Sequence, residues 1–501
     1  MKDEIKKIVT GIIAVLIIGV IIWFTRPLWH WFFMGIYTFP AIWESAIAAG
    51  IGTSIPIVWD RLKKRRSYYD ATEIIGFFLI AFIVLLIILS PFSAMYPQCY
   101  LAQNLKTTKI TELPEMDTSA IRILPFSVAE RYGEDALQYS QFKLGKGDIV
   151  FLNRSPYWAF GLIPKGAINF FVLKDKGVLY VDMTSLKKNI TIIEQEMEVG
   201  EGMGIIDGYE WQIYQRRYWV NLENPYFVYL KGDLYIAVPV ISYEYHWKIP
   251  SFFAVPKWEG TALIDSKGKI TFLAPDEARK VLKDQKLFPE KLARYYVDSF
   301  QYTHGILNKW FYHYDQLEIA DVYGQQNEQP FLVKTKEGLK WLVACEPYGE
   351  AHGIFRIYLI DAQTGKIQVY EQPKTEALIG PVRAVDYVQK ANPIVDWTRM
   401  MPVEPIPMIV KGQLFWQVRV VPRDGAGIAY IAMVNARTGE VVELKTEKEV
   451  KEFLEGKYKP EEKIPEISKH TTALIIIREN GKEIQRIELL PNQSIEIIPA
   501  A

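Results

Sequence analysis

The hydrophobic pattern divides the chain into an apolar amino-terminal part and a longer part of mixed pattern. Three long apolar stretches lie within the first 96 residues, and the remainder alternates short apolar runs with polar turns. The first stretch, from Ile8 to Phe24, has Thr10 as its only polar residue. About 20 apolar residues in a helix cross a hydrocarbon core of about 30 Å. The pattern therefore predicts an anchor of three membrane-spanning helices.

The other two stretches differ in regularity. The second, about Trp31 to Trp59, contains two prolines and Glu44, whereas the third, Ile74 to Met95, is nearly continuous. A carboxylate at membrane depth is costly unless it is neutral or paired. Glu44 is therefore either a functional candidate within the membrane or a residue near its surface, beside Pro40. Whether this second stretch spans completely stays open.

Basic residues indicate the orientation of the spans. Lysines precede the first span, and a basic loop separates the second from the third. Because positively charged flanks stay on the cytoplasmic side, three crossings place residues 97–501 outside the cytoplasm. We expect an integral membrane protein whose amino terminus is cytoplasmic and whose first partner is the lipid bilayer. The basic-loop residues that determine this topology are Arg61, Lys63, Lys64, Arg65 and Arg66.

The charge balance argues against nucleic acid as a partner. The chain has 58 basic and 58 acidic residues, so its formal net charge is zero and no global field attracts a polyanion. The two cysteines, Cys99 and Cys345, are too few for an exported chain of this size that depends on disulfides. Whether these two cysteines pair stays open.

Three related modules follow one another in the extramembrane part. Each begins with a proline, an apolar strand, a short Lys/Gly turn and a second strand, and each ends in a further hairpin. In the closing hairpin, Asp or Asn accepts hydrogen bonds from turn amides, and Gly takes the positive φ that other residues resist. The turn residues are Asp265 and Gly268 in the first module, Asp361 and Gly365 in the second, and Asn435 and Gly439 in the third.

These patterns predict an α-helical transmembrane bundle of three spans followed by an α+β ectodomain of tandem antiparallel-sheet modules with packed helices. Before the modules, Ile168 to Leu173 is expected to be a strand that turns into a second strand, Val178 to Val181. Asn480-Gly481 predicts a hairpin near the carboxyl terminus. The expected boundaries are an anchor at 1–96, a tether at 97–118, a first mixed domain at 119–220, repeat modules at 221–310, 311–395 and 396–456, a linker at 457–470 and a small β segment at 471–501.

The closing hairpins resemble the PepSY module, whose signature ends in a strand followed by Asp-Ala-x-Thr-Gly-(Lys/Glu)-Val. Asp361 to Ile367 matches this signature well, Asn435 to Val441 has Asn in place of Asp, and Asp265 to Gly268 is shortened. The resemblance implies an extracytoplasmic α+β module of the kind linked to inhibiting or regulating proteases, or to envelope assembly. It implies no catalytic residues.

The sequence contains no Gly-x-Ser-x-Gly elbow, no His-Glu-x-x-His, no Walker A loop and no Cys-x-x-Cys. His304 and His313, together with His352 and a carboxylate, could form a metal site, but their spacing fits no standard zinc pattern. We therefore expect no catalytic residues, no metal and no cofactor.

The expected function is that of a non-enzymatic, membrane-anchored extracytoplasmic protein that binds or scaffolds other envelope proteins, or associates with itself. Exposed sheet edges and many aromatic residues suit protein contacts. Two alternatives stay open: a regulator or inhibitor of an envelope protease, and a subunit of a membrane transport or secretion complex in which Glu44 lines an interface.

Overall fold

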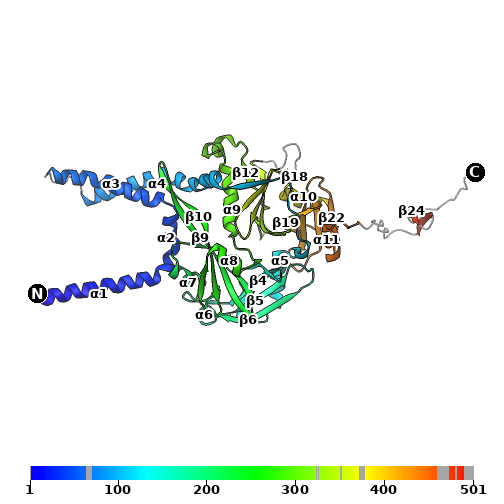
Figure 1. Cartoon of the computed structure of the whole chain (residues 1–501), viewed down its shortest axis with the longest axis horizontal. Helices are drawn as coiled ribbons and strands as arrows, with labels where there is room; N and C mark the ends of the chain where they lie inside the picture. Colours follow the sequence, from blue (N-terminus) through cyan, green and yellow to red (C-terminus); the bar gives the residue numbers. More distant parts are fainter. Residues whose placement is uncertain are drawn as a thin grey trace, which may run out of the picture. The chain divides into compact units, whose positions relative to one another are not determined.

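The computed structural model describes residues 2–63, 70–322, 324, 327–349, 353–371, 378–459, 473–479 and 482–489. Contacts between residues divide the chain into two compact units, Met1–Gly456 and Lys457–Ala501. In the first unit, long apolar helices are followed by a part built from several β-sheets with helices (Figure 1). The predicted α+β class with an apolar, helical amino-terminal region is therefore confirmed.

Three stretches of the amino-terminal helices have the length and composition needed to cross a membrane, as the hydrophobic pattern predicted. The longest helix, α4, continues through Pro91 and Pro97. The helices of this region are α1 (Lys2–Thr25), the 3-10 turn η1 (Arg26–Trp29), α2 (His30–Thr38), α3 (Ala41–Leu62) and α4 (Ala71–Asn104).

The second predicted stretch, Trp31 to Trp59, is two helices rather than one. Its first part belongs to α2, which ends before Phe39, and only Ala41–Trp59 in α3 has the properties of a separate span. Phe39 has φ −123° and ψ 76°, outside the helical region. The ring of Pro40 crowds the backbone of the preceding residue and so disfavours a continuous helix at this point.

The segment expected to be a tether, 97–118, contains regular structure. Helix α4 runs through its first residues, and β1 (Thr107–Ile110) then pairs in parallel with β17 (Ile367–Glu371). Only Leu105 and Lys106 separate α4 from β1. The last apolar helix is thus joined directly to the edge of a sheet.

Four sheets of the first unit share one plan, in which a helix precedes an antiparallel meander of four strands. We call them sheets 1 to 4 in chain order. The meander of sheet 1 consists of β3 (Asp148–Leu152), β4 (Ser155–Pro164), β5 (Asp175–Asp182) and β6 (Ile190–Met197), and that of sheet 2 of β8 (Tyr226–Leu230), β9 (Asp233–Lys248), β10 (Ser251–Asp265) and β11 (Ile270–Leu273). The meander of sheet 3 consists of β13 (Phe331–Thr335), β14 (Gly338–Pro347), β16 (Arg356–Asp361) and β17. The meander of sheet 4 consists of β19 (Met400–Val410), β20 (Gln413–Pro422), β21 (Tyr430–Asn435) and β22 (Val441–Leu444). The preceding helices are α5 (Phe126–Ala136), α7 (Tyr209–Arg216), α9 (Glu290–Ser299) and α10 (Pro381–Ala391).

Sheets 2, 3 and 4 carry the three closing hairpins seen in the sequence, and sheet 1 is a further copy of the same plan within 119–220. Its last hairpin has no glycine between β5 and β6. There the Asp182 side chain accepts hydrogen bonds from the backbone N–H and the hydroxyl of Thr184, at 2.8 and 2.7 Å. The missing glycine is the physical reason that the sequence pattern did not reveal this copy.

The predicted strand Ile168–Leu173 is wrong, because this segment contains the short helix α6 (Ala167–Val172). β4 pairs with β5 directly, and α6 lies in the connection between them. Gly166 has φ +94°, which directs the chain out of β4 before the apolar residues begin. A short apolar run fits a strand and a helix equally well by periodicity, so the sequence could not separate them.

Sheet 1 contributes its two faces to two different cores. On β4, the side chains of Trp158, Phe160 and Leu162 belong to a core shared with α9 and sheet 3, whereas Ala159 packs in a core shared with sheet 2. Alternate residues of a strand point to opposite faces, which accounts for this division. Sheet 1 therefore packs against sheet 2 with one face and against sheet 3 with the other, so residues of all three sheets lie close together.

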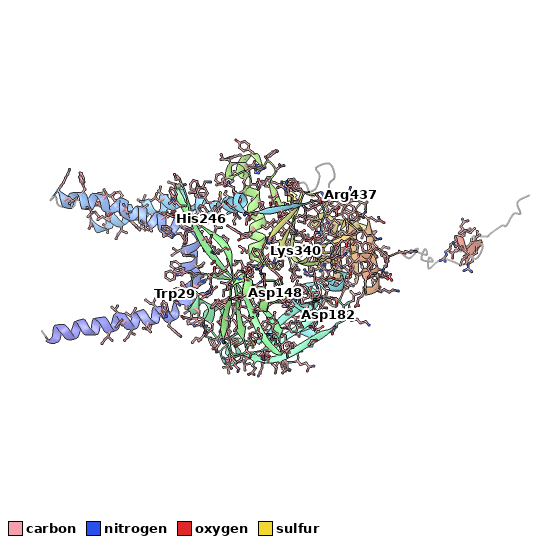
Figure 2. All side chains as sticks on the ribbon, viewed as in Figure 1. Trp29, Asp148, Asp182, His246, Lys340 and Arg437 are labelled. Carbon is pink, nitrogen blue, oxygen red and sulfur yellow. The ribbon has the colours of Figure 1, made fainter. Side chains whose placement is uncertain are left out.

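The hairpin of β9 and β10 contacts the apolar helices. The hydroxyl of Tyr96 in α4 donates to the carbonyl of Ile249 at 2.7 Å. His246 of β9, labelled in Figure 2, stacks on Tyr100 of α4 with ring centroids 4.1 Å apart. These contacts connect the amino-terminal helices to sheet 2.

The remaining elements extend the sheets or close the chain. In the second unit, β23 and β24 form an antiparallel pair, and the predicted Asn480-Gly481 turn lies outside the described residues. The additional elements are η2 (Thr118–Ala120), β2 (Phe142–Leu144), β7 (Asn221–Leu222), α8 (Pro275–Val281), η3 (Phe300–Tyr302), η4 (Asn308–Tyr312), β12 (Leu317–Ile319), β15 (Gly353–Ile354), β18 (Leu378–Ile379), α11 (Glu447–Leu454), β23 (Ala473–Glu479) and β24 (Lys482–Leu489).

Candidate ligand-binding cavity

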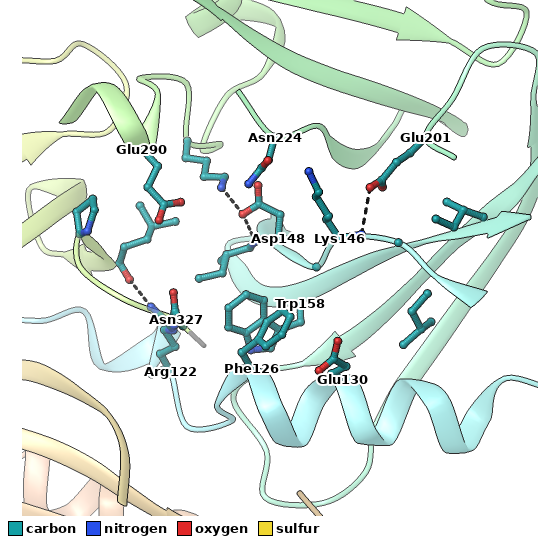
Figure 3. A pocket seen from close by; sticks show the side chains of 18 of the residues that line it. Arg122, Phe126, Glu130, Lys146, Asp148, Trp158, Glu201, Asn224, Glu290 and Asn327 are labelled. Atoms are coloured by element: carbon teal, nitrogen blue, oxygen red, sulfur yellow. Dashed lines mark hydrogen bonds and ion pairs between the residues drawn. The ribbon is translucent and has the colours of Figure 1, made fainter. Parts of the chain in front are cut away.

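A polar cavity of about 550 Å³ lies where sheets 1, 2 and 3 meet (Figure 3). Its size falls in the range of small-molecule and peptide sites in proteins. Trp158, Phe126 and Trp341 form part of the wall, and charged side chains of both signs form another large part. The charged residues that line it are Arg122, Glu130, Lys143, Lys146, Asp148, Glu201, Lys286 and Glu290.

One side of the cavity is formed by the glycine-containing loop between β2 and β3. The backbone N–H of Gly145 donates to the carbonyl of Gly161 at 2.7 Å, which fixes the loop on β4. A Cβ atom at Gly147 would overlap the rings of Phe160 and Phe126. Glycine at this position therefore allows the loop to lie close to the aromatic wall. The exposed Lys146 lies between the two glycines.

The segment before α9 enters the cavity and is held by all three sheets. The Gln285 side chain exchanges hydrogen bonds with the backbone of Phe151, accepting from its N–H at 3.1 Å and donating to its carbonyl. The hydroxyl of Tyr226 donates to the carbonyl of Lys286 at 2.7 Å, and the indole N–H of Trp341 donates to the carbonyl of Phe288 at 2.9 Å. This anchoring fixes the position of the Lys286 side chain.

Lys286 and Asp148, which is labelled in Figure 3, form a buried ion pair in the cavity wall. A second bond to the Asp148 carboxylate comes from the backbone N–H of Ile149, at 2.7 Å. The Lys286 ammonium lies 5.5 Å from the ring centre of Tyr226 and 5.4 Å from that of Trp341. Burial nevertheless raises the pKa of Asp148, and Lys286 opposes that shift. Each partner compensates the charge of the other.

Glu290 begins α9 and points at the same cavity (Figure 3). Its carboxylate makes no hydrogen bond and no ion pair with any described residue. Burial raises the pKa of Glu290 to about 7, opposed by the charges of Lys286 and Arg122 and reinforced by those of Asp148 and Glu223. Near neutral pH this carboxyl group is therefore poised between its neutral and charged forms.

Arg122 belongs to a buried ion cluster, which we define as Arg122, Glu404 and Arg419. The Glu404 carboxylate accepts from the guanidinium groups of Arg122 at 3.1 Å and Arg419 at 2.6 Å, and from the backbone N–H of Phe126 at 2.7 Å. Glu404 sits at a bulge of β19 with φ +45°, which directs its side chain out of the regular pattern of sheet 4. The Nε atom of Arg122 is buried and has no hydrogen-bond partner within the described part of the chain.

The opposite wall contains a second carboxylate, that of Glu201. One of its oxygens accepts from the backbone N–H of Lys146 at 3.2 Å, and the other is buried without a partner among the residues described. Burial raises the pKa of Glu201. The fully buried Asp175 accepts from the backbone N–H of Glu201 at 2.7 Å and so positions this residue.

The structure places Glu44 in the first turn of α3, against the tip of the β9–β10 hairpin. Its carboxylate accepts from the backbone N–H of Phe252 at 2.7 Å and from the hydroxyl of Ser251 at 2.5 Å. Glu44 thus has protein partners at the point where α3 meets the β9–β10 hairpin. It does not line the polar cavity.

The six turn residues of the closing hairpins hold their turns in a common way. In each hairpin the Asp or Asn side chain accepts from the backbone N–H two positions further on, at 2.9 to 3.1 Å. Each turn glycine has a positive φ, between +74° and +76°. The acceptors are Asp265, Asp361 and Asn435, and the glycines are Gly268, Gly365 and Gly439.

The other sequence candidates do not come together. The ammonium of Lys63 lies 4.5 Å from the ring centre of Trp59, whereas the residues at 64–66 are outside the described part, and Arg61 lies in α3. Cys99 and Cys345 are buried and unpaired with each other. Burial raises the pKa of the Cys345 thiol. The structure therefore assigns neither cysteine to a disulfide.

The candidate histidines have aromatic partners. His304 lies edge-on to Tyr314, with ring centroids 5.3 Å apart, and His313 stacks on Tyr348 at 4.2 Å. His352 falls outside the described residues. Among the residues described, no group of three His, Cys, Asp or Glu side chains is arranged to hold a metal ion.

No protein-family model, curated protein or solved structure matches this chain. The geometry of the cavity is therefore the feature from which a function can be inferred. Its residues come from segments far apart in the sequence, and the Gly145-Lys146-Gly147-Asp148 loop is the one local signal that could have pointed to it.

Proposed function

We propose that this chain is a membrane-anchored, non-enzymatic binding protein whose extracytoplasmic sheets receive part of another envelope component in the polar cavity. The observation that carries the proposal is the cavity itself, built jointly by three modules and lined by Glu201 and Glu290, whose carboxylates have no cationic partner among the described residues. A buried carboxylate without a partner is unfavourable unless something binds it. A ligand would supply the missing partner.

The wall of the cavity is suited to binding because its polar groups are fixed before a ligand arrives. Asp148, Lys286 and Arg122 are each held by protein partners. Fixed groups lose little side-chain freedom when a ligand binds, which leaves more of the interaction energy for affinity. The tandem modules, and the resemblance of their closing hairpins to PepSY, support a binding role outside the cytoplasm.

Membrane anchorage is supported by the three apolar helices and by the basic residues that flank them. The contacts of Glu44 and Tyr96 with the β9–β10 hairpin join these helices to sheet 2. The cavity would therefore be held at a limited distance from the bilayer, where other envelope proteins are its neighbours.

The proposal is tested by replacing Lys146 with a photoreactive amino acid in the full-length chain in its native membranes. Lys146 is exposed and lines the cavity. We expect a discrete cross-linked product with one envelope protein, identified by mass spectrometry. A matched replacement at Lys269, an exposed lysine in the β10–β11 turn, is the control. No product at Lys146, or the same products at both positions, would contradict the proposal.

A further inference from the structure

We infer that the cavity binds the free amino end of a peptide chain, with its ammonium at Glu290 and its first carbonyl oxygens at the Arg122 Nε and Asn327 side-chain N–H groups. This inference rests on the proposed binding function and names the chemistry of the ligand. Figure 3 shows Glu290, Asn327 and Arg122 along the same side of the cavity.

Among the buried and half-buried side chains that line the cavity, the charges without an ion pair to any described residue are carboxylates, whereas the lysines without one, Lys143 and Lys146, are exposed. The buried cations already have carboxylate partners, since Lys286 pairs with Asp148 and Arg122 with Glu404. The carboxylate of Glu290 makes no hydrogen bond or ion pair with the described residues. A ligand with a positive group is therefore required to complete the charge balance of this wall.

The donors that lack a partner require an oxygen from the same ligand. Arg122 is 7% exposed, and its Nε has no acceptor within the described part of the chain. The side-chain nitrogen of Asn327 is likewise buried without a partner there. A buried donor left without an acceptor costs about 1 to 3 kcal/mol, so the preferred ligand brings carbonyl oxygens to this corner.

A peptide amino terminus carries both features close together, an ammonium group and a carbonyl oxygen one residue further along. A polyamine supplies the positive charge but no acceptor, and its further charges would meet the exposed Lys143 and Lys146 beside the loop. A free anion would supply acceptors but would leave Glu290 without a partner and add a like charge beside it. The walls of Trp158 and Phe126 offer apolar surface to short side chains.

The number of protons released on peptide binding is a second measurement, independent of the affinity, that reports on Glu290. The pKa of Glu290 is raised to about 7 by burial, so a large fraction of this group is protonated at pH 6 and most of it is ionised at pH 8. An ammonium beside the carboxyl group favours its charged form. Binding should therefore release protons at pH 6. At pH 8 Glu290 has few protons to release, and the peptide amine, whose ordinary pKa is about 8, should take up protons instead.

The test is isothermal titration of the full-length protein in mild detergent with tri-alanine, its N-acetyl derivative and its carboxyl-terminal amide. We expect the free peptide and its amide to bind alike, and the N-acetyl derivative to bind about tenfold or more weakly. In wild type, the binding enthalpy at pH 6 should depend on the ionisation enthalpy of the buffer. Glu290→Gln should reduce the affinity for tri-alanine to that for the acetylated peptide.

Glu337→Gln is the matched control, since Glu337 is exposed and lies outside the cavity. Equal affinity for free and acetylated peptides, or spermidine binding as tightly as tri-alanine, would overturn the inference. These comparisons use the wild-type chain, so they decide the matter even if Glu290→Gln does not fold. Failure of all peptides while the Lys146 cross-link persists would overturn this inference alone, and loss of the cross-link would overturn the proposed function.

Discussion

Two sets of buried charges, the ion cluster and the cavity carboxylates, lie close to each other and differ in how they are partnered. In the ion cluster, Glu404 accepts bonds from two guanidinium groups and a backbone N–H. In the cavity, Glu290 has no such bond with the described residues, and Glu201 has one from a backbone N–H. Arg122 belongs to both regions, because it pairs with Glu404 and lines the cavity.

This difference distinguishes buried charges that stabilise the fold from buried charges that can bind a ligand. In the ion cluster the bonds around Glu404 stabilise the fold, and the Glu404 carboxylate leaves no uncompensated charge for a ligand. An incomplete set is unfavourable alone and becomes favourable when a ligand supplies the missing groups. The same residue types thus have opposite roles within one part of the chain, and each role predicts a different response to mutation.

The largest effect is expected from Glu404→Ala. This change leaves the guanidinium groups of Arg122 and Arg419 buried without their carboxylate, which destabilises proteins by about 3 to 5 kcal/mol. We expect a strongly lowered thermal unfolding midpoint of the full chain in detergent. Glu337→Ala, at an exposed turn, should change stability by no more than about 0.5 kcal/mol. Equal effects of the two changes would show that the ion cluster is not structural.

Glu290→Gln should increase the stability of the folded protein, whereas Glu404→Ala should decrease it. The folded protein holds the Glu290 proton up to a pKa of about 7, whereas the unfolded chain releases it at the ordinary value of 4.5. The native state therefore binds more protons between these values, and its stability falls as pH rises through this window. Glutamine does not ionise, so the variant should be more stable than the wild type by up to about 3 kcal/mol at pH 8 and by little at pH 4.5. Unfolding midpoints of both proteins across this pH range measure the difference, and a pH-independent difference would contradict the assignment.

Gly147→Ala tests the shape of the cavity. The added Cβ would overlap the rings of Phe160 and Phe126, and overpacking of this kind costs about 1 to 3 kcal/mol. We expect reduced stability and weaker peptide binding, measured by thermal unfolding and titration calorimetry. Gly427→Ala is the matched control, because the nearest atom to its added Cβ is the Tyr132 hydroxyl at 3.7 Å. Unchanged binding in Gly147→Ala would mean that the loop does not form the ligand's wall.

The smallest effect is expected from Glu201→Gln. The amide oxygen of glutamine can still accept from the backbone N–H of Lys146, so the bond seen at 3.2 Å is retained. Burial raises the pKa of Glu201, so removal of its charge favours folding at pH 8, whereas the amide N–H groups in place of its unpartnered oxygen oppose folding. The net change in stability should therefore be within about 1 kcal/mol. A clear loss of stability would place Glu201 with the ion cluster instead of with the cavity.

The sequence predicted what depends on local pattern. Long apolar runs predicted three helices of membrane-crossing length, and Asp or Asn with Gly indicated the closing hairpins. Where local signals were weak the predictions failed: Ile168–Leu173 was assigned to a strand but contains α6, and sheet 1 was not seen as a further copy because its last hairpin has no glycine.

The cavity could not be predicted, because its partners meet only through tertiary packing. Lys286 and Asp148 are 138 residues apart, and Arg122 and Glu404 are 282 apart. Glu404 reaches Arg122 through a bulge that reverses the usual alternation of β19. Nothing in the residues around either position distinguishes these side chains from the other acids and bases of a chain that has 58 of each.

The most direct test of the account is electron cryo-microscopy of the full-length protein purified from its native membranes together with whatever it binds. The account predicts a stretch of density inside the cavity that contacts the Glu290 carboxylate at one end and the Arg122 Nε and Asn327 side chain beside it. A map in which a partner is bound elsewhere, while only isolated water-sized peaks lie in the cavity, would contradict it.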